Sequence, residues 1–191
     1  DTGTFEVLDP IYFSKDKNLV YYKENPLPDS DPNSFKYITS SYGKDNNSAY
    51  YQNRKIINSD PDSFEIINSS KKYTKDKNNI YYKENKLEGA SPDNFTIISE
   101  GISKTDKYVY FKDKIIIGAD PETFCSFPGP DTSWKLFYKD KHSIYLMGEK
   151  LNNIDYDSFI LINSYTAKDK NNTYKANYNP DTDEHFLEIV N

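Results

Sequence analysis

The residues with the greatest chemical capability are an acid, a base and a phenol that stand close together between Asp76 and Tyr82. Such a set can exchange protons, and taken alone it resembles part of an active site. The stretch reads DKNNIYY, and it recurs as DKNLVYY at 16–22, DNNSAYY at 45–51, TDKYVYF at 105–111, DKHSIYL at 140–146 and DKNNTYK at 169–175. Recurrence of this kind is typical of a structural repeat. We therefore interpret Asp and Asn as residues of a hairpin tip, since both cap tight turns with their own side chains.

Histidine and cysteine offer little further chemistry. His142 occupies a tip position that holds Asn in sister copies, His185 lies beside Glu184, and no HExxH pattern is present. Cys125 follows Phe124 on a predicted strand. Because it is the single cysteine of the sequence, neither an internal disulfide nor a CxxC motif is possible. We expect no catalytic residue, no metal ligand and no cofactor, and hence no enzyme.

Repeated acids are the remaining signal for a metal. Asp29, Asp31 and Asn33 resemble the start of a calcium loop. An EF-hand loop from Asp29 would need Gly at its sixth place and Glu at its twelfth, where this chain has Ser34 and Ser40. Capping of a turn explains Asp31, and likewise Asp60 and Asp120, without a metal.

Charge and hydropathy restrict the classes of partner. The formal charge is −6 and no basic block is present, so the sequence disfavours nucleic-acid binding. No apolar run approaches the roughly 20 residues that span a bilayer, so we expect no membrane insertion. The first residue is Asp1, and we expect a processed protein or an excised fragment, with export to the surface or periplasm favoured.

The 18 Tyr and 11 Phe residues must supply much of the core.

The spacing of aromatic residues defines the repeat. The first aromatic residues of the six copies are separated by 29, 31, 29, 35 and 29 residues, and they are Tyr21, Tyr50, Tyr81, Tyr110, Tyr145 and Tyr174. A phenylalanine follows 14 residues after each of the first five, at Phe35, Phe64, Phe95, Phe124 and Phe159. Periods of this size predict a tandem architecture.

Each period predicts one hairpin and one short helical turn. The turn is indicated by Asp-Pro or Ser-Pro before the phenylalanine, as at Asp60-Pro61, because the side chain caps the turn and Pro presets φ. In the third repeat, for example, the first strand of the hairpin (strand A) is expected to run from Phe64 to Lys75, and the second (strand B) from Ile80 to Leu87. The fold class is thus an all-β, elongated array of six hairpin repeats, with a closed propeller-like ring as the alternative. We expect one repeat domain over 1–191, with repeats at 4–30, 31–59, 60–90, 91–119, 120–154 and 155–182 and a final strand at 183–191.

Period-two alternation divides the aromatic residues between two faces. Tyr81 and Leu87 are predicted to share the core face. The residue after each repeat tyrosine points the other way and is expected to be partly exposed, which makes Tyr22, Tyr51, Tyr82 and Phe111 candidates for ligand contact. Trp134, in the insertion that contains Pro128 and Pro130, is a further candidate.

The motifs at 16–22 and 76–82 resemble those of the DKNYY family of bacterial proteins, and the similarity covers roughly residues 5–186. The resemblance implies the repeat and an exported setting, and it carries over no binding or catalytic residue. Our leading functional hypothesis is a non-catalytic, cell-surface or secreted interaction module with a protein or glycan partner. A structural spacer and a glycan-binding repeat that uses exposed aromatic rings are the alternatives. The oligomeric state is left open.

Overall fold

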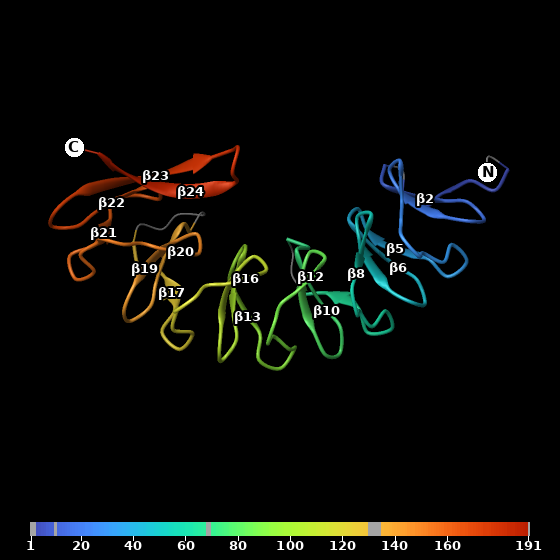
Figure 1. The fold of residues 1–191 in the computed structure, drawn as a ribbon, viewed down its shortest axis with the longest axis horizontal. Coiled ribbons are helices and arrows are strands. Elements are labelled where there is room, and N and C mark those ends of the chain that lie inside the picture. The colour runs from blue at the N-terminus through green and yellow to red at the C-terminus, as the bar shows by residue number, and fades with distance from the viewer. Residues whose placement is uncertain (1–2, 10, 68–69, 130–134, 191) are drawn as a thin grey trace. The chain divides into compact units, whose positions relative to one another are not determined.

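The computed structural model describes residues 3–9, 11–67, 70–129 and 135–190, and short antiparallel strands make up its regular structure (Figure 1). The chain divides into two compact units, Asp1–Asp93 and Asn94–Asn191, with three four-stranded sheets in each. No helix is present among the described residues, and therefore none of a length and hydropathy that could cross a membrane.

The first unit holds sheets A, B and C, which we name in chain order. Sheet A contains β1 (Glu6–Val7), β2 (Phe13–Lys15), β3 (Val20–Tyr22) and β4 (Asn25–Pro26). Sheet B contains β5 (Lys36–Thr39), β6 (Tyr42–Lys44), β7 (Ala49–Tyr51) and β8 (Arg54–Ile56). Sheet C contains β9 (Glu65–Ile66), β10 (Tyr73–Lys75), β11 (Ile80–Tyr82) and β12 (Asn85–Lys86).

The second unit holds sheets D, E and F. Sheet D contains β13 (Thr96–Ser99), β14 (Ile102–Lys104), β15 (Val109–Phe111) and β16 (Lys114–Ile115). Sheet E contains β17 (Cys125–Ser126), β18 (Phe137–Lys139), β19 (Ile144–Leu146) and β20 (Glu149–Lys150). Sheet F contains β21 (Ile160–Leu161), β22 (Thr166–Lys168), β23 (Thr173–Asn179) and β24 (Glu184–Val190).

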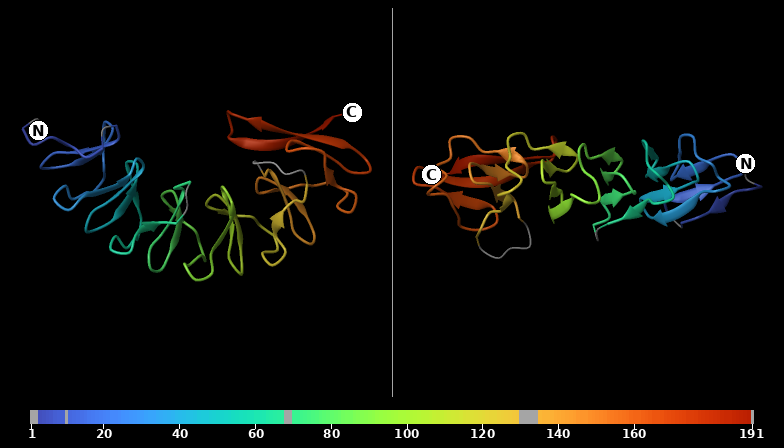
Figure 2. Two further views of the ribbon diagram at one scale, coloured as in Figure 1. Left: turned by 180° about the vertical axis from the view of Figure 1, so that it is seen from behind. Right: turned by 90° about the horizontal axis from the view of Figure 1, so that it is seen from below.

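The predicted all-β tandem repeat is confirmed. Each of the ranges 4–30, 31–59, 60–90, 91–119 and 120–154 holds one sheet, whose strands follow one another in chain order (Figure 2). The last sheet differs from the others, because the strand expected at 183–191 is β24, which pairs with all seven residues of β23. This strand therefore completes sheet F.

The expectation of two long strands per repeat is wrong. In sheet C, the predicted strand A consists of β9 and β10, and the predicted strand B consists of β11 and β12. The second break is a two-residue turn at 83–84, where Lys83 adopts a φ of 56°. A left-handed residue occupies this position in the first five sheets, and these residues are Lys23, Gln52, Lys83, Lys112 and Met147. None of these residue types favours positive φ, so the left-handed position could not be predicted from the residue that occupies it.

The predicted helical turns are also absent. In the segment at 31–35, the amide of Phe35 donates to the carbonyl of Asp31 at 3.1 Å, which closes a single turn. The Asp31 side chain accepts from the Asn33 amide and the Ser34 hydroxyl. Five residues that lead directly into a strand cannot continue the hydrogen-bond ladder of a helix. The Asp therefore caps an isolated turn.

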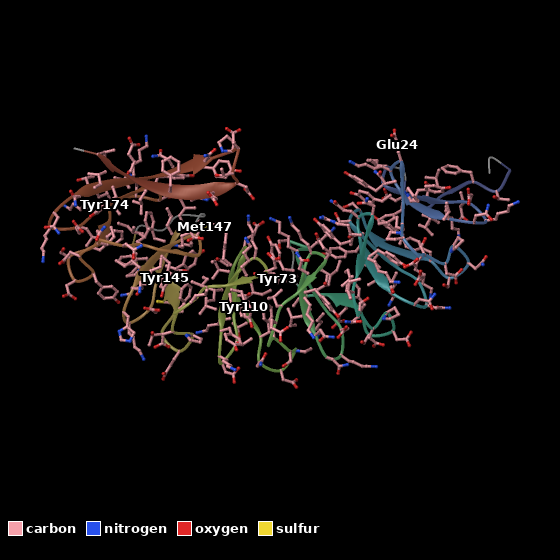
Figure 3. The ribbon with its side chains drawn as sticks, in the orientation of Figure 1. Glu24, Tyr73, Tyr110, Tyr145, Met147 and Tyr174 are labelled. Carbon is pink, nitrogen blue, oxygen red and sulfur yellow. The ribbon has the colours of Figure 1, made fainter. Side chains whose placement is uncertain are left out.

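The core lies between successive sheets, so both faces of most sheets are buried. Phe13, Val20, Tyr22 and Leu27 of the first repeat pack against Phe35 and Tyr50 of the second. The same pattern joins sheet B to sheet C, sheet D to sheet E and sheet E to sheet F. We call the face that contacts the next sheet the forward face, and the opposite face the rear face. The predicted burial of the repeat tyrosine is confirmed for Tyr50, Tyr81, Tyr110, Tyr145 and Tyr174, three of which are labelled in Figure 3.

The predicted partnership of Tyr81 with Leu87 on one face is wrong. The Leu87 amide donates to the Ile80 carbonyl across the turn at 83–84, so Leu87 lies opposite Ile80 and shares its face. Tyr82 is on that face as well, two residues along the strand. Tyr81 belongs to the rear face, and Leu87 and Tyr82 belong to the forward face. Period-two counting failed because the chain reverses between these residues.

Gly43 marks the closest approach between sheets. A Cβ atom at this position would lie 2.2 Å from Cζ of Phe35, which is itself buried between sheets A and B. Ala167 occupies the corresponding position in sheet F, so alanine is compatible with the strand itself. The restriction at Gly43 therefore comes from the ring above it.

We predict that Gly43→Ala lowers the free energy of unfolding by about 1 to 3 kcal/mol, because the added methyl forces Phe35 out of its packed position. Ser14→Ala is the matched control, because it places alanine at the same position of sheet A, where the site is only half-buried. Urea unfolding followed by circular dichroism measures both. Equal stability of the two variants would contradict close packing at Gly43.

Candidate functional site

The acid of the recurring motif is buried and accepts a set of four hydrogen bonds, and Asp76 also accepts two longer ones, of 3.2 and 3.3 Å, from the Asn79 side-chain amide. Oδ1 of Asp76 accepts from the amides of Asn78 and Asn79, both at 2.8 Å. Oδ2 accepts from the hydroxyl of Tyr81 at 2.6 Å and from the amide of Asp60 at 3.0 Å. One carboxylate thus joins the hairpin tip, the following strand and the turn that precedes the sheet.

The same four bonds recur in three other repeats. Asp45 accepts from Asn47, Ser48, Tyr50 and Asp31. Asp140 accepts from His142, Ser143, Tyr145 and Asp120. Asp169 accepts from Asn171, Asn172, Tyr174 and Asp155. The predicted role of Asp at the hairpin tip is confirmed, and the tyrosine and the preceding turn are partners that the sequence did not reveal.

These bonds shift the ionisation of both partners. Burial alone would raise the pKa of Asp76, but the bonds from Tyr81, Asp60 and Asn78 lower the pKa below its usual value. The same balance lowers the pKa of Asp169 to about 2. Burial, together with the bond to the charged carboxylate, raises the pKa of the Tyr81 hydroxyl. At neutral pH the acid is ionised and the phenol is neutral, so neither group is poised for proton transfer.

The fourth repeat carries Thr105 at the position of this acid. Its hydroxyl accepts from the amides of Lys107 and Tyr108, at 3.2 and 2.9 Å. The two tip amides therefore keep a side-chain acceptor, which shows that capping of the tip does not require a charge.

The predicted ligand-contact row is less exposed than expected. Tyr22 and Tyr82 are only 7% and 4% exposed, so the expectation of partial exposure is wrong for these two residues. Tyr51 and Phe111 are half-buried. For Tyr22, Tyr51 and Phe111 the cause is the stacking of sheets, because these residues lie on the forward face and pack into the cluster shared with the next sheet. Sequence alternation could not distinguish a solvated face from a second packed face.

A basic side chain also covers each ring of this row. The contacts pair Lys23 with Tyr22, Arg54 with Tyr51, Lys83 with Tyr82 and Lys112 with Phe111, and the distances to the ring centroids are 5.1 to 5.9 Å. All four cations come from the turn or strand that follows the ring. A ligand that stacks on these rings must first displace the cation. Trp134, the fifth candidate, lies outside the described residues.

Histidine and cysteine are dispersed in the structure. His142 is exposed at its hairpin tip, as expected for a turn residue, and Cys125 is exposed on β17. Among the described residues, no three His, Cys, Asp or Glu side chains are placed to hold a metal ion.

His185 belongs to a groove that the sequence did not predict. The groove has a volume of about 460 Å³, and it is lined by Glu149 of β20 and by Asn179, Thr182, Glu184, His185 and Phe186 of the last hairpin. The hairpin of β23 and β24 folds back over sheet E, where β24 contacts β19 (Figures 1 and 2). An ion pair of 2.9 Å between Asp183 and Lys112 holds its end beside sheet D.

The groove combines an apolar ring with hydrogen-bonding groups. Phe186 is 49% exposed, and two carboxylates, an amide and a hydroxyl lie around it. Burial lowers the pKa of His185, which contacts the Tyr178 ring at 5.1 Å, so the imidazole is mostly neutral at neutral pH. The groove is therefore net acidic. Its only sequence signal was the irregular spacing of the last repeat, where Phe186 follows Tyr174 by 12 residues instead of 14.

We predict that Tyr81→Phe lowers the free energy of unfolding by about 1.5 to 3 kcal/mol, because the ionised Asp76 stays buried and loses its hydroxyl donor. Tyr21→Phe is the matched control, since its bond to Asp16 is longer, at 3.2 Å, and Tyr21 is only half-buried. Urea denaturation compares the two variants. A loss at Tyr21 as large as that at Tyr81 would argue against the role of the buried bond.

We also predict a stability plateau with an acid and an alkaline limit. The lowered pKa values of Asp76, Asp140 and Asp169 contribute stability above the unfolded value of about 4, and this contribution is lost as the pH falls towards about 2. The raised pKa values of Tyr50, Tyr81 and Tyr145 contribute stability below about pH 10, which is lost as the pH rises further. Unfolding midpoints in urea from pH 2 to 11 measure both limits. A midpoint that stays constant from pH 4 to 2 would contradict the assignment.

The comparisons with known proteins agree with the repeat geometry. The sequence profile of the DKNYY family matches residues 13–129 and 42–178, two overlapping alignments that together cover more than half of the chain. No curated protein and no solved structure matches the chain. The matched region contains all six copies of the recurring motif, from DKNLVYY at 16–22 to DKNNTYK at 169–175, and five of them carry the Asp. The chain therefore belongs to the DKNYY family.

Proposed function

We propose that the chain is a non-catalytic interaction module, acting at the cell surface or in secreted form, and that its contact site lies in sheets E and F. The groove around Phe186 is the observation that carries the proposal. This groove combines an exposed aromatic ring with several polar side chains that the repeat bonding does not use.

The chemistry of the groove favours a glycan as ligand. An exposed ring can stack on the apolar face of a sugar, while carboxylates and amides bind its hydroxyl groups. Phe186 supplies the ring, and Glu149, Glu184 and Asn179 supply the polar groups. The acidic character of the groove disfavours anionic polymers, which is consistent with the net charge of −6.

The non-catalytic part of the proposal rests on how the reactive groups are used. The recurring carboxylates and phenols are bonded to one another and to turn amides, with the carboxylate ionised and the phenol neutral. A structural spacer is the second candidate function, and the stacked sheets favour it because each sheet is held by its neighbours. A spacer needs no groove, so a binding experiment separates the two functions.

We predict that the purified chain binds members of a neutral glycan panel, and that Phe186→Ser or Glu149→Gln weakens binding at least about tenfold, equivalent to about 1.4 kcal/mol. Ile117→Ser is the control, because Ile117 is 88% exposed and does not line the groove. Surface plasmon resonance measures affinity, and urea unfolding confirms that the variants fold.

Three results would contradict the proposal. Absence of binding to every glycan would favour a spacer. Equal binding by Phe186→Ser and the unchanged chain would remove the groove as the contact site. Hydrolysis of a bound glycan that disappears in Glu149→Gln would show catalysis.

A further inference from the structure

The rear face of sheet A differs from the rear faces of later sheets in its exposure. Phe5 stands in the position of the later repeat phenylalanines, since FEVL at 5–8 corresponds to FEII at 64–67. Phe5 is 55% exposed, whereas Phe35, Phe64, Phe124 and Phe159 are 2 to 5% exposed. Phe95, at the start of the second unit, is half-buried. A large aromatic ring is thus left in solvent where its counterparts form the core.

Two further positions on this face, Ser14 and Tyr21, show the same difference. Val7, Ser14 and Tyr21 form one row across sheet A, because Val7 pairs with Ser14 and Ser14 with Tyr21. Val7 is exposed, and Ser14 and Tyr21 are half-buried. The positions equivalent to Ser14 and Tyr21 are buried in every later sheet. The surface therefore has the composition and register of a repeat interface, and it lacks the partner sheet.

The interfaces inside the chain show what such a partner looks like. The rear face of sheet B receives Phe13, Val20, Tyr22 and Leu27 from the forward face of the preceding repeat. The Phe35 ring lies 5.6 Å from the Phe13 ring and 6.1 Å from the Tyr50 ring, so it is enclosed from both sides. An aromatic and aliphatic forward face is the complement of this rear face.

A second copy of this chain does not supply that complement through its last sheet. The positions that hold Phe13, Val20 and Tyr22 in sheet A hold Thr166, Thr173 and Lys175 in sheet F. Glu188 lies opposite Lys175, and its carboxylate accepts a hydrogen bond of 3.0 Å from the side-chain amide of Asn177. At these three positions the forward face of sheet F is polar, as in the capping repeats of solenoid proteins, although Val190 and Phe186 lie on the same face.

We propose that the rear face of sheet A is a docking face for a further repeat sheet of the DKNYY type, carried by polypeptide other than residues 1–191, whose forward face bears aromatic and aliphatic side chains. The occupant covers Phe5, Val7 and Tyr21 in the manner of the interfaces within the chain. Docking continues the series of sheet-to-sheet contacts by one step and removes an exposed apolar patch.

The sequence shows where an additional repeat can be fused to the chain to test this proposal. DTGTF at 1–5 corresponds to DPDSF at 60–64, and Thr4 accepts from the Lys17 amide as Ser63 accepts from the Lys77 amide. A copy of residues 31–59 placed directly before Asp1 therefore reproduces the junction that links sheet B to sheet C. This copy carries the forward face formed by Tyr42, Ala49, Tyr51 and Ile56.

We expect the extended chain to unfold as one unit with a higher urea midpoint, and with an m-value larger by roughly 15%, in proportion to the added length. Amides of β2 and β3 should exchange at least about tenfold more slowly. Phe5→Ser should shift the midpoint little in the unextended chain, where the ring is exposed, and should remove the gain in the extended chain. Tyr51→Lys in the added copy is the matched control on the other side of the interface, and it too should remove the gain.

Two outcomes would overturn the proposal. One is an extended chain with the midpoint and amide exchange of the unextended chain, whether the added copy stays unfolded or folds separately. The other is a dimer of the unextended chain that sedimentation detects and Phe5→Ser abolishes, since the face would then pair with its own copy. Neither result bears on the glycan binding of the groove variants Phe186→Ser and Glu149→Gln. The docking proposal can therefore fail while the proposed glycan binding holds, and the reverse.

Discussion

The structure depends on a carboxylate that is buried at five of the six hairpin tips and must be fully hydrogen-bonded there. A buried charge is costly unless donors replace the lost water. In sheet C, Asp76 obtains them from two tip amides, from Tyr81 and from the amide of Asp60. These donors come from the turn that begins the repeat, from the hairpin tip and from the strand after the tip, so one buried charge connects these three parts of the repeat.

Packing between sheets supplies what a single unit lacks. Strands of two to four residues have little stability alone, and an isolated small sheet buries too little apolar surface. Stacking buries both faces, with aromatic rings from one sheet enclosed by rings from the next, as Phe35 lies between Phe13 and Tyr50. Close contact also restricts residue size, which explains Gly43 below Phe35. Stability in such an array is therefore shared between neighbours.

This use of side chains determines where function can reside. The acids and tyrosines of the motif are hydrogen-bonded within the repeats. The rings predicted to contact a ligand are packed in the core or covered by cations. Residues outside the repeat bonding are found where the pattern is broken. The last hairpin, with its longer strands, forms most of the groove at Phe186, and sheet A exposes Phe5 where four later repeats bury their phenylalanine. Both proposals concern these departures from the repeat.

The sequence by itself determined the repeat, its period, the all-β class and the role of Asp76 at a hairpin tip, because each depends on local residue types at fixed spacing. It did not determine the reversal at Lys83, since a left-handed lysine has no local signature. Only the tertiary structure decided that Leu87 lies with Tyr82, that Tyr82 is buried, and that Glu149 meets Phe186 in one groove. These results depend on which sheet covers which face, and alternation along a strand carries no information about a neighbour supplied by another repeat.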